Sequence, residues 1–419
     1  MILMNYCPSA LLTKYIGENF HYFIAYCIFF RVFPNYFSFF FNGAIVLLLG
    51  SVLPFIIQET EINYTVAGTM LSLFALGNFS ASLVNPILSK LLGRKNSILI
   101  TSIFQPFALF FLTLKLPVFV FMVVFFTLGI CRGCYSILNN AFINEKGDGS
   151  ASALNILHMV FAIGAFISPL VLSFFVNCGL GWRYAVYFVI FGSAISFVLL
   201  FTLDYSQNSS ANADNSKTEV SENPSRQQVK FWKSAVFYVS GFLLFFYLGL
   251  ENCVNGWFVS YFKDTGIMSQ TFSNSLVSFT WAAVLFGRMV TAVLAKKMNP
   301  KILILTDCIA TAIFFILLTV SSNLLLVTIS ILGLGFFFAG IYPTVVANAG
   351  KAIRGSDAGT SALLAIAALG GIITPQIVGT VADRTGLMGA ISLLVINVAA
   401  MIILGIVNCF KINGNPKSH

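Results

Sequence analysis

The feature that most constrains this chain is a series of long apolar segments that recurs along nearly its whole length. A helix needs about 20 apolar residues to cross a bilayer core about 30 Å thick. Each segment must be helical, because lipid offers no hydrogen-bond partner to an open backbone. Charged residues, Gly, Pro or Asn bound the predicted spans, which are 35–57, 64–88, 97–115, 117–141, 151–176, 183–203, 235–262, 271–296, 301–320, 323–347, 358–382 and 389–408.

Composition agrees with this all-α integral membrane fold of twelve transmembrane helices. Hydrophobic residues make up 58% of the 419 residues and charged residues only 9%, whereas soluble chains carry about 25% charged residues. A net charge of +9 would indicate nucleic acid in a soluble protein. Here the basic residues lie between spans, so we expect no nucleic-acid partner.

The distribution of Lys and Arg predicts the orientation, because cytoplasmic loops carry an excess of both. With the amino terminus inside, 17 of the 23 basic residues fall on the cytoplasmic side. Four, Lys115, Arg183, Lys263 and Arg384, fall outside, and Arg132 and Arg288 lie within spans. We therefore predict a multi-pass protein of the cell membrane with both termini cytoplasmic.

A polar segment divides the spans six and six. Residues 204–231 are rich in Ser and Asn and lack apolar periodicity, which is typical of a flexible linker. The short apolar run from Phe20 to Phe30 is better suited to an interfacial helix than to a span, and no small-residue cleavage site follows it. The predicted organisation is an extension 1–33, a bundle 34–203, a cytoplasmic linker 204–231, a bundle 232–410 and a cytoplasmic tail 411–419.

The two bundles carry an internal repeat. Residues 162–169 (AIGAFISP) match 368–375 (ALGGIITP) at an offset of 206, and Leu128-Gly129 matches Leu334-Gly335 at the same offset. Matches in one register across two helices indicate a duplicated six-helix unit. Parallel repeats of this kind place a solute site near the midplane between the halves, which rock around it.

These features resemble the major facilitator superfamily, whose members have six plus six helices and a long cytoplasmic middle loop. The segment SKLLGRK at 89–95 is similar to the family's signature between helices 2 and 3, with Lys90 where the family has Asp. The resemblance implies a gating role for Arg94 and Lys95. Arg132-Gly133 in the fourth span resembles a second family motif.

Within that superfamily the chain most resembles the group of fucose–proton symporters and sodium-dependent glucose transporters. The likeness rests on GCYSILNNAF at 133–142, on NILHMVFAIGAFISP at 155–169, and on the Glu251, Trp257 and Tyr261 spacing. Fucose symporters have an acid where this chain has Ser136, which argues against fucose itself.

Ionisable residues within spans are costly, so each is a candidate for function. Glu251 lies deep in the seventh span beside Asn252 and Asn255, and a carboxyl group there could exchange a proton as the cavity opens to either side. Arg132 could bind solute or hold helices together, at about the depth of His158. His158 is either a proton relay or a satisfied core residue.

Two further charges lie within spans, on consecutive helices. Arg288 and Asp307 have similar predicted depths, which favours a structural ion pair near the cytoplasmic gate. Neutral polar and aromatic residues would complete a cavity suited to sugar hydroxyls, although each amide could also link helices. These residues are Ser136, Asn139, Asn140, Asn155, Asn252, Asn255, Trp257, Trp281 and Tyr342.

The resulting prediction is a secondary active transporter for a small polar solute, most simply a sugar, coupled to protons or sodium and functional as a monomer. Efflux of amphipathic compounds is the alternative, which the 45 Phe residues keep open. The sequence has no filter-like segment for a channel, and its three His and few acids do not form an enzyme's constellation. A receptor that has lost transport stays open. We expect no cofactor and no metal, and we interpret Cys131 and Cys134 as small packing residues.

Overall fold

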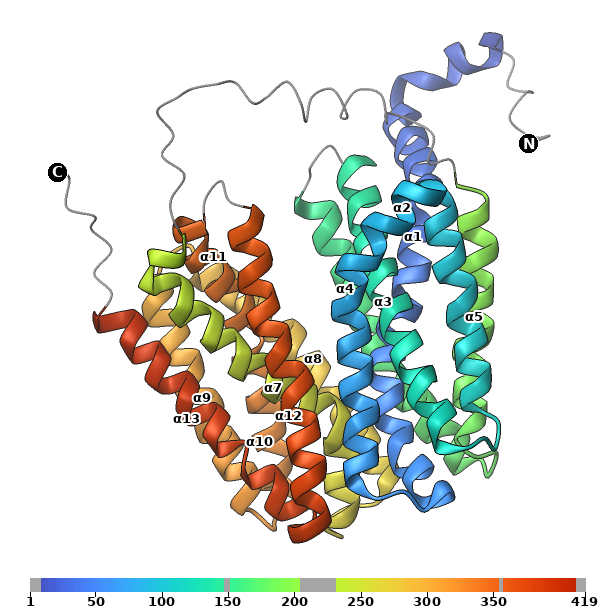
Figure 1. Ribbon diagram of the computed structural model, residues 1–419. Coiled ribbons are helices and arrows are strands. Elements are labelled where there is room, and N and C mark those ends of the chain that lie inside the picture. Colours follow the sequence, from blue (N-terminus) through green and yellow to red (C-terminus); the bar gives the residue numbers. More distant parts are fainter. Residues whose placement is uncertain (1–8, 147–150, 204–230, 354–356, 412–419) are drawn as a thin grey trace, which may run out of the picture.

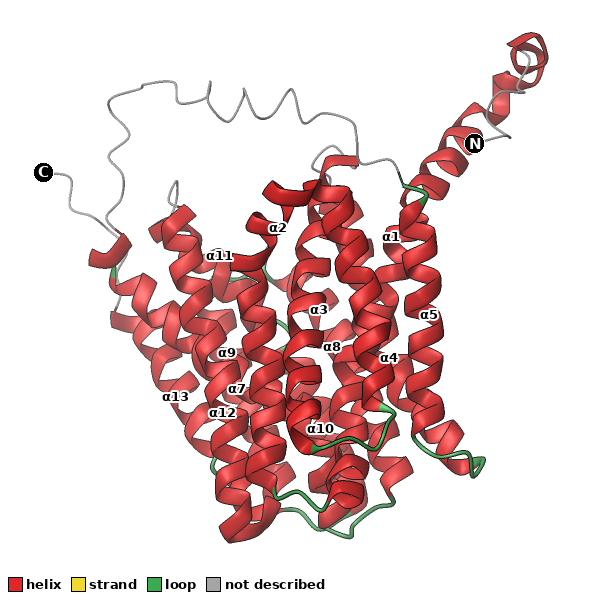
Figure 2. Cartoon of the chain, turned by 45° about the vertical axis from the view of Figure 1, so that its right-hand side comes forward, coloured by secondary structure: helices red, strands yellow, loops and turns green. Residues whose placement is uncertain are grey.

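The computed structural model describes residues 9–146, 151–203, 231–353 and 357–411, and we number its elements along the chain (Figure 1). Within these residues the regular structure is helical, without a strand (Figure 2). Nearly all of the predicted linker and tail therefore lies outside the described residues. The first helix, α1 (Ser9–Thr60), includes a candidate span Val32–Thr60.

Ten helical segments of the described chain are long and apolar enough to cross a membrane. One of them, α2 (Tyr64–Leu112), has 49 residues, which at about 1.5 Å per residue is about 74 Å and more than twice the bilayer core. It bends at Gly93, whose φ of 77° suits only glycine. The last segment, Gly359–Phe410, bends likewise at Gly386, within α12 (Asp357–Ser392). Divided at both bends, the ten segments supply the twelve predicted crossings.

The remaining helices follow the predicted spans and extend past several of them. Asn side chains begin three helices by accepting backbone N–H groups, namely Asn63 for α2, Asn299 for α9 and Asn323 for α10. The bounds are α3 (Val118–Lys146), α4 (Ala151–Asn177), α5 (Arg183–Phe201), η1 (Phe231–Lys233), α7 (Ala235–Asp264), α8 (Gln270–Leu294), α9 (Pro300–Val320), α10 (Leu324–Phe338), α11 (Ile341–Ile353), α13 (Val395–Ile406) and η2 (Val407–Lys411).

The helices form two groups that lie side by side (Figure 1). Helices α1–α5 make the amino-terminal half, and α7–α13 make the carboxyl-terminal half. We call the end of the molecule with Arg94, Lys95, Lys296 and Lys301 the basic end. The opposite end, with Glu61, Lys115, Lys263 and Arg384, is the far end.

The internal repeat is present as equivalent helix contacts in both halves. A β-carbon at Gly129 would lie 2.2 Å from the carbonyl oxygen of Phe74, and one at Gly335 would lie 2.7 Å from that of Thr280. The two residues contacted, Phe74 and Thr280, are themselves 206 positions apart. In the same way Gly164 lies against the backbone of Phe40 and Gly370 against that of Phe245. Glycine is thus required at these positions because backbones touch there.

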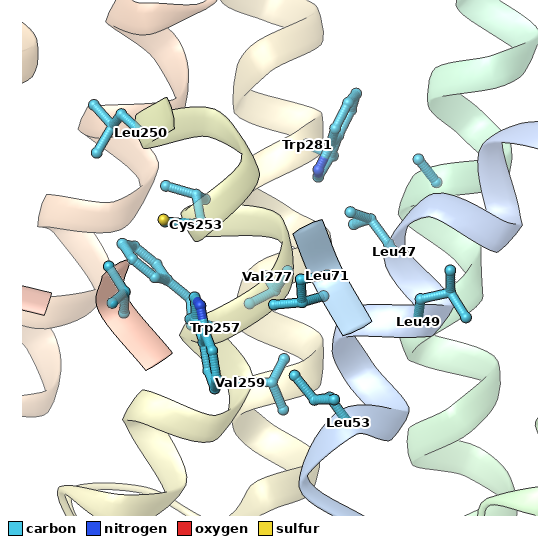
Figure 3. Packing of buried hydrophobic residues seen from close by; sticks show 14 of the residues in the cluster. Leu47, Leu49, Leu53, Leu71, Leu250, Cys253, Trp257, Val259, Val277 and Trp281 are labelled. Carbon is cyan, nitrogen blue, oxygen red and sulfur yellow. The ribbon is translucent and has the colours of Figure 1, made fainter. Parts of the chain in front are cut away.

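The halves meet along a seam of buried side chains. Leu71 of α2 lies between Trp257 and Val259 of α7 and the leucines of α1, as Figure 3 shows. Toward the far end the two backbones come into direct contact, since a β-carbon at Gly379 would lie 2.3 Å from the carbonyl oxygen of Tyr64. The seam therefore fixes one side of any space enclosed between the halves.

Candidate functional site

A cavity of about 190 Å³ lies at the seam, with walls from both halves. Helices α1–α4 supply one wall and α7, α8 and α12 supply the other. Most of its lining is apolar, with a few polar groups that converge, as in typical solute sites. The lining residues are Val46, Phe74, Ala75, Asn78, Arg132, Phe161, Leu248, Glu251, Asn252, Asn255, Trp281, Ala368 and Gly371.

Glu251 brings a carboxyl group into this cavity from close to the midpoint of α7. The hydroxyl of Tyr247, one turn earlier on the same face, donates a hydrogen bond to it. The positive charges of Arg288 and Arg132 both act on this carboxyl group. Neither arginine forms an ion pair with Glu251. The ion pairs among the described residues are Arg94–Glu145 and Arg183–Glu59.

Arg132 reaches the cavity from the midpoint of α3. Its Nη1 donates a hydrogen bond of 2.7 Å to Oδ1 of Asn78, and its guanidinium group lies 5.6 Å from the ring centroid of Phe161. Arg132 and Glu251 therefore line the same cavity from opposite halves of the molecule.

Two amides and an indole form the wall opposite Arg132. Asn252 Nδ2 donates to the carbonyl oxygen of Gly371 at 2.9 Å, and Trp281 Nε1 donates to Oδ1 of Asn255 at 3.2 Å. Within the described chain, Oδ1 of Asn252 and Nδ2 of Asn255 have no hydrogen bond. This wall therefore presents one acceptor and one donor to a bound solute, beside an aromatic ring.

A second polar group lies nearer the basic end. Nε2 of His158 lies 3.1 Å from Oδ1 of Asn140, whose Nδ2 donates to the backbone oxygen of Ser136 at 2.7 Å. Asn140 lies two turns beyond Arg132, or about 12 Å along the helix, so Arg132 and His158 differ in depth. His158, Asn140 and Ser136 do not line the cavity. His158 is exposed and lies between the cavity and the basic end.

Three other predicted solute ligands lie away from the cavity. Asn139 is fully buried and links α1 to α3, where its Oδ1 accepts from Asn35 at 2.9 Å. Trp257 is fully buried and donates to the carbonyl oxygen of Pro375 at 3.2 Å. The ring of Tyr342 lies 6.1 Å from that of Tyr247, behind Glu251. The side chain of Asn155 lies outside the described residues.

The predicted gating residues divide into two cases. At the basic end Arg94 pairs with Glu145 of the same half, and Lys95 lies 5.8 Å from the ring centroid of Phe201. The predicted ion pair of Arg288 and Asp307 is not formed. The charge of Arg288 acts on Glu251 and His158, whereas Asp307 is buried beside Thr291 and Gly340 with no hydrogen bond to Oδ2 in the described chain. Similar depth on neighbouring helices does not make two side chains face each other.

Sequence reasoning missed two polar residues of the site. Asn78 lies within the predicted span 64–88, so an amide inside a span is the signal that could have identified it. Tyr247 stands four residues before Glu251, a spacing that places both on one helix face. Cys131 and Cys134 are buried and free, and the described residues contain no cluster of three metal-ligating side chains.

Ten described segments long and apolar enough to cross a membrane, arranged in two repeated halves with a polar cavity between them, are the architecture of a membrane transporter. Residues 35–375 match the model of the Major Facilitator Superfamily. The chain belongs to this superfamily of transporters and is not an enzyme.

Several sugar transporters are among its relatives. The chain is 24% identical over 362 residues to the glucose/mannose transporter GlcP of Bacillus subtilis, an alignment covering 82% of this chain and 86% of the relative. It is 23% identical over 387 residues to a TsgA homologue of Buchnera aphidicola, covering 90% and 94%. A glucose/galactose transporter of Brucella abortus shares 26% identity over 147 residues, or 34% of this chain and 35% of the relative.

Solved structures show the same fold. A D-xylose–proton symporter superposes with a TM-score of 0.76 at 14% identity, over 92% of this chain and 98% of that one. The nucleoside transporter NupG superposes with a TM-score of 0.71 at 14% identity, over 92% and 99%. At such identity the likeness concerns architecture alone.

Proposed function

We propose that this protein is a solute–ion symporter whose solute is a sugar or a similarly polar metabolite. The observation that carries this proposal is the composition of the cavity. Arg132, Glu251, Asn252 and Asn255 face one space together with the Trp281 indole. Hydroxyl-rich solutes need both donors and acceptors, and their apolar faces stack on aromatic rings. The names of the sugar-transporting relatives support the same solute class.

The size of the cavity favours a small solute over the alternative of drug efflux. Pockets for drug-sized ligands enclose about 300–1,000 Å³, whereas this one encloses about 190 Å³. A bulky amphipathic compound would have to displace Phe74, Phe161 or Trp281. We therefore expect monosaccharides to bind more tightly than amphipathic cations.

Glu251 is the coupling residue in this proposal. Its carboxyl group lies on the cavity wall, where it exchanges a proton or contacts a cation as the cavity opens to alternate sides. Arg132 belongs to the other half, so the distance of its positive charge from Glu251 changes when the halves rock, whereas Arg288 lies in the same half as Glu251 and moves with it. His158, with Asn140, lies on the route from the basic end and would pass protons along it. The working unit is one chain, since both walls come from one chain.

The orientation of the protein in the membrane is a further part of this proposal. With the basic end in the cytoplasm, both termini are cytoplasmic and the far end faces outward. The closed far end then corresponds to an inward-facing protein in the cell membrane.

Uptake into proteoliposomes tests the proposal. Wild-type protein should accumulate a labelled hexose against its gradient when an ion gradient is imposed. Glu251→Gln should lose accumulation yet keep exchange of internal for external solute, because the amide can bind but cannot be charged. The matched control is Glu61→Gln, an exposed acid at the far end.

Retained accumulation by Glu251→Gln would exclude the coupling role. A thermal-shift screen against sugars, nucleosides and amphipathic cations tests the solute class, since a ligand of the folded state raises its stability. Stabilisation by amphipathic cations alone would replace the sugar proposal with efflux.

A further inference from the structure

A second buried carboxyl group lies outside the cavity and plays no part in the function proposed above. Asp307 of α9 is 5% exposed, and its Oδ2 has no hydrogen-bond partner in the described chain. A lone carboxylate in such surroundings is costly unless a cation accompanies it. None of the described basic side chains pairs with it.

Two threonines lie beside Asp307, one on the next turn of its own helix and one on α8. Thr311, one turn further along α9, is fully buried, and its Oγ1 has no partner in the described chain. Thr306 of the same helix shows the ordinary arrangement, in which the hydroxyl donates to the backbone oxygen of Ile302 at 3.0 Å. Thr291 of α8 supplies the second hydroxyl. Its Oγ1 and Asp307 Oδ2 would lie 2.4 Å and 2.8 Å from a β-carbon at Gly340, so both oxygens crowd the same point of the backbone.

The backbone beside these oxygens is the short break between two helices. Helix α10 ends at Phe338, and α11 begins at Ile341, so Gly340 lies between them. The carboxyl end of one helix and the amino end of the next meet there, and their partial charges oppose each other. The backbone therefore does not replace a cation as the partner of the Asp307 carboxylate.

We propose that Asp307, Thr291 and Thr311 form a sodium-binding site inside the carboxyl-terminal half, separate from the solute cavity. All three side chains offer oxygen, the donor that hard cations prefer. A proton on Asp307 would also neutralise its charge, whereas a sodium ion would in addition take lone pairs from the two hydroxyl groups. The response of the protein to sodium distinguishes the two.

The site is placed to affect the solute cavity through α8. Thr291 stands three residues beyond Arg288, whose charge acts on Glu251, and Trp281 of the same helix lines the cavity. An ion that ties Thr291 to α9 would hold this helix in position. That consequence rests on the proposed function and would make sodium the coupling ion, whereas binding itself does not depend on transport.

Thermal unfolding of the purified protein in NaCl, KCl and choline chloride at constant ionic strength tests the site directly. Wild-type protein should gain a saturable rise in melting temperature in NaCl only. Asp307→Asn, which keeps the shape of the side chain, should abolish that rise. Thr311→Val should raise the half-saturating sodium concentration about tenfold, whereas the matched control Thr306→Val should leave it unchanged.

Glu251→Gln should keep the sodium response, because it alters only the solute cavity. A sodium response that survives Asp307→Asn, or disappears in Glu251→Gln, would overturn the proposed site. A wild-type protein without any sodium response would also overturn it, and Asp307 would then be a protonated acid. Failure of sugar uptake with an intact sodium response would count against the proposed function and leave the site standing.

Discussion

The two ends of the seam between the halves differ in how they are held. At the far end, Asp383 accepts the backbone N–H groups of Tyr64 and Thr65 at 2.7 and 3.0 Å, and Tyr64 donates to Asp264. Two turns deeper, Ser72 donates to the carbonyl oxygen of Ile372 at 2.6 Å. At the basic end the described polar contacts stay within one half.

Arg94 with Glu145 in the amino-terminal half and Asn348 with Asn408 in the carboxyl-terminal half illustrate that second pattern. Every described hydrogen bond between the halves lies on the far side of the cavity. At the far end, hydrogen bonds between the halves hold them together, and we call these contacts the latch. At the basic end, the described polar contacts do not join the halves. A carrier that alternates needs such an asymmetry, and the latch must be weak enough to open.

The largest expected effect comes from forcing the far end apart. Gly379→Ala adds a β-carbon 2.3 Å from the carbonyl oxygen of Tyr64. Overpacking costs about 1–3 kcal/mol, so the ratio of closed to open protein should fall about fivefold to a hundredfold. Distances between spin labels at positions 115 and 325, in a cysteine-free background, report the opening.

The matched control is Gly350→Ala, because Gly350 has open space around its missing side chain. Equal behaviour of the two variants would show that backbone contact does not hold the far end closed.

A smaller effect is expected from the charge that caps α2. Asp383→Asn weakens the interaction of a carboxylate with the first-turn N–H groups, which is typically worth about 1 kcal/mol. The closed population should therefore fall about fivefold. The distance between spin labels at positions 115 and 325 measures this change. The control is Arg384→Gln, which alters the neighbouring exposed residue. An Asp383→Asn protein as closed as the wild type would mean that the cap is incidental.

Removing the hydroxyl of Tyr64 should have a weaker effect. Tyr64→Phe deletes the hydrogen bond to Asp264 and keeps the ring contact with Trp257, whose centroid is 6.1 Å away. One exposed hydrogen bond contributes about 0.5–1.5 kcal/mol. The rate at which a thiol reagent labels a cysteine at position 265 should rise by a few fold. A change as large as that of Gly379→Ala would mean that this hydroxyl dominates the latch.

The smallest effect is expected at the basic end. Arg94→Gln breaks an exposed ion pair with Glu145, which is worth about 0–1 kcal/mol and is screened by salt. Because both residues belong to one half, label distances at the far end should not change. An altered far-end distance would show that the pair does couple the halves and would remove the asymmetry between the ends.

Much of this architecture follows from the sequence. The apolar runs indicate the spans, and the offset of 206 that relates Gly129 to Gly335 and Gly164 to Gly370 recurs as equivalent backbone contacts. Local polar residues mark where helices begin, as Asn63, Asn299 and Asn323 do. Glu251 and Arg132 stand out because an ionisable group in lipid needs a reason to be there.

Side-chain direction decided the rest. Asn139 and Asn140 are neighbours in sequence, yet one is buried against α1 and the other faces His158. Arg288 and Asp307 have similar predicted depth, yet they form no ion pair in the described chain. The sequence by itself determined the membrane class, the spans and the duplicated halves, because these depend on local apolarity and on periodicity. Only the tertiary structure decided which polar groups share a cavity, which latch the far end, and which, like Asp307, are left without a partner, because that depends on the rotation of each helix against its neighbours.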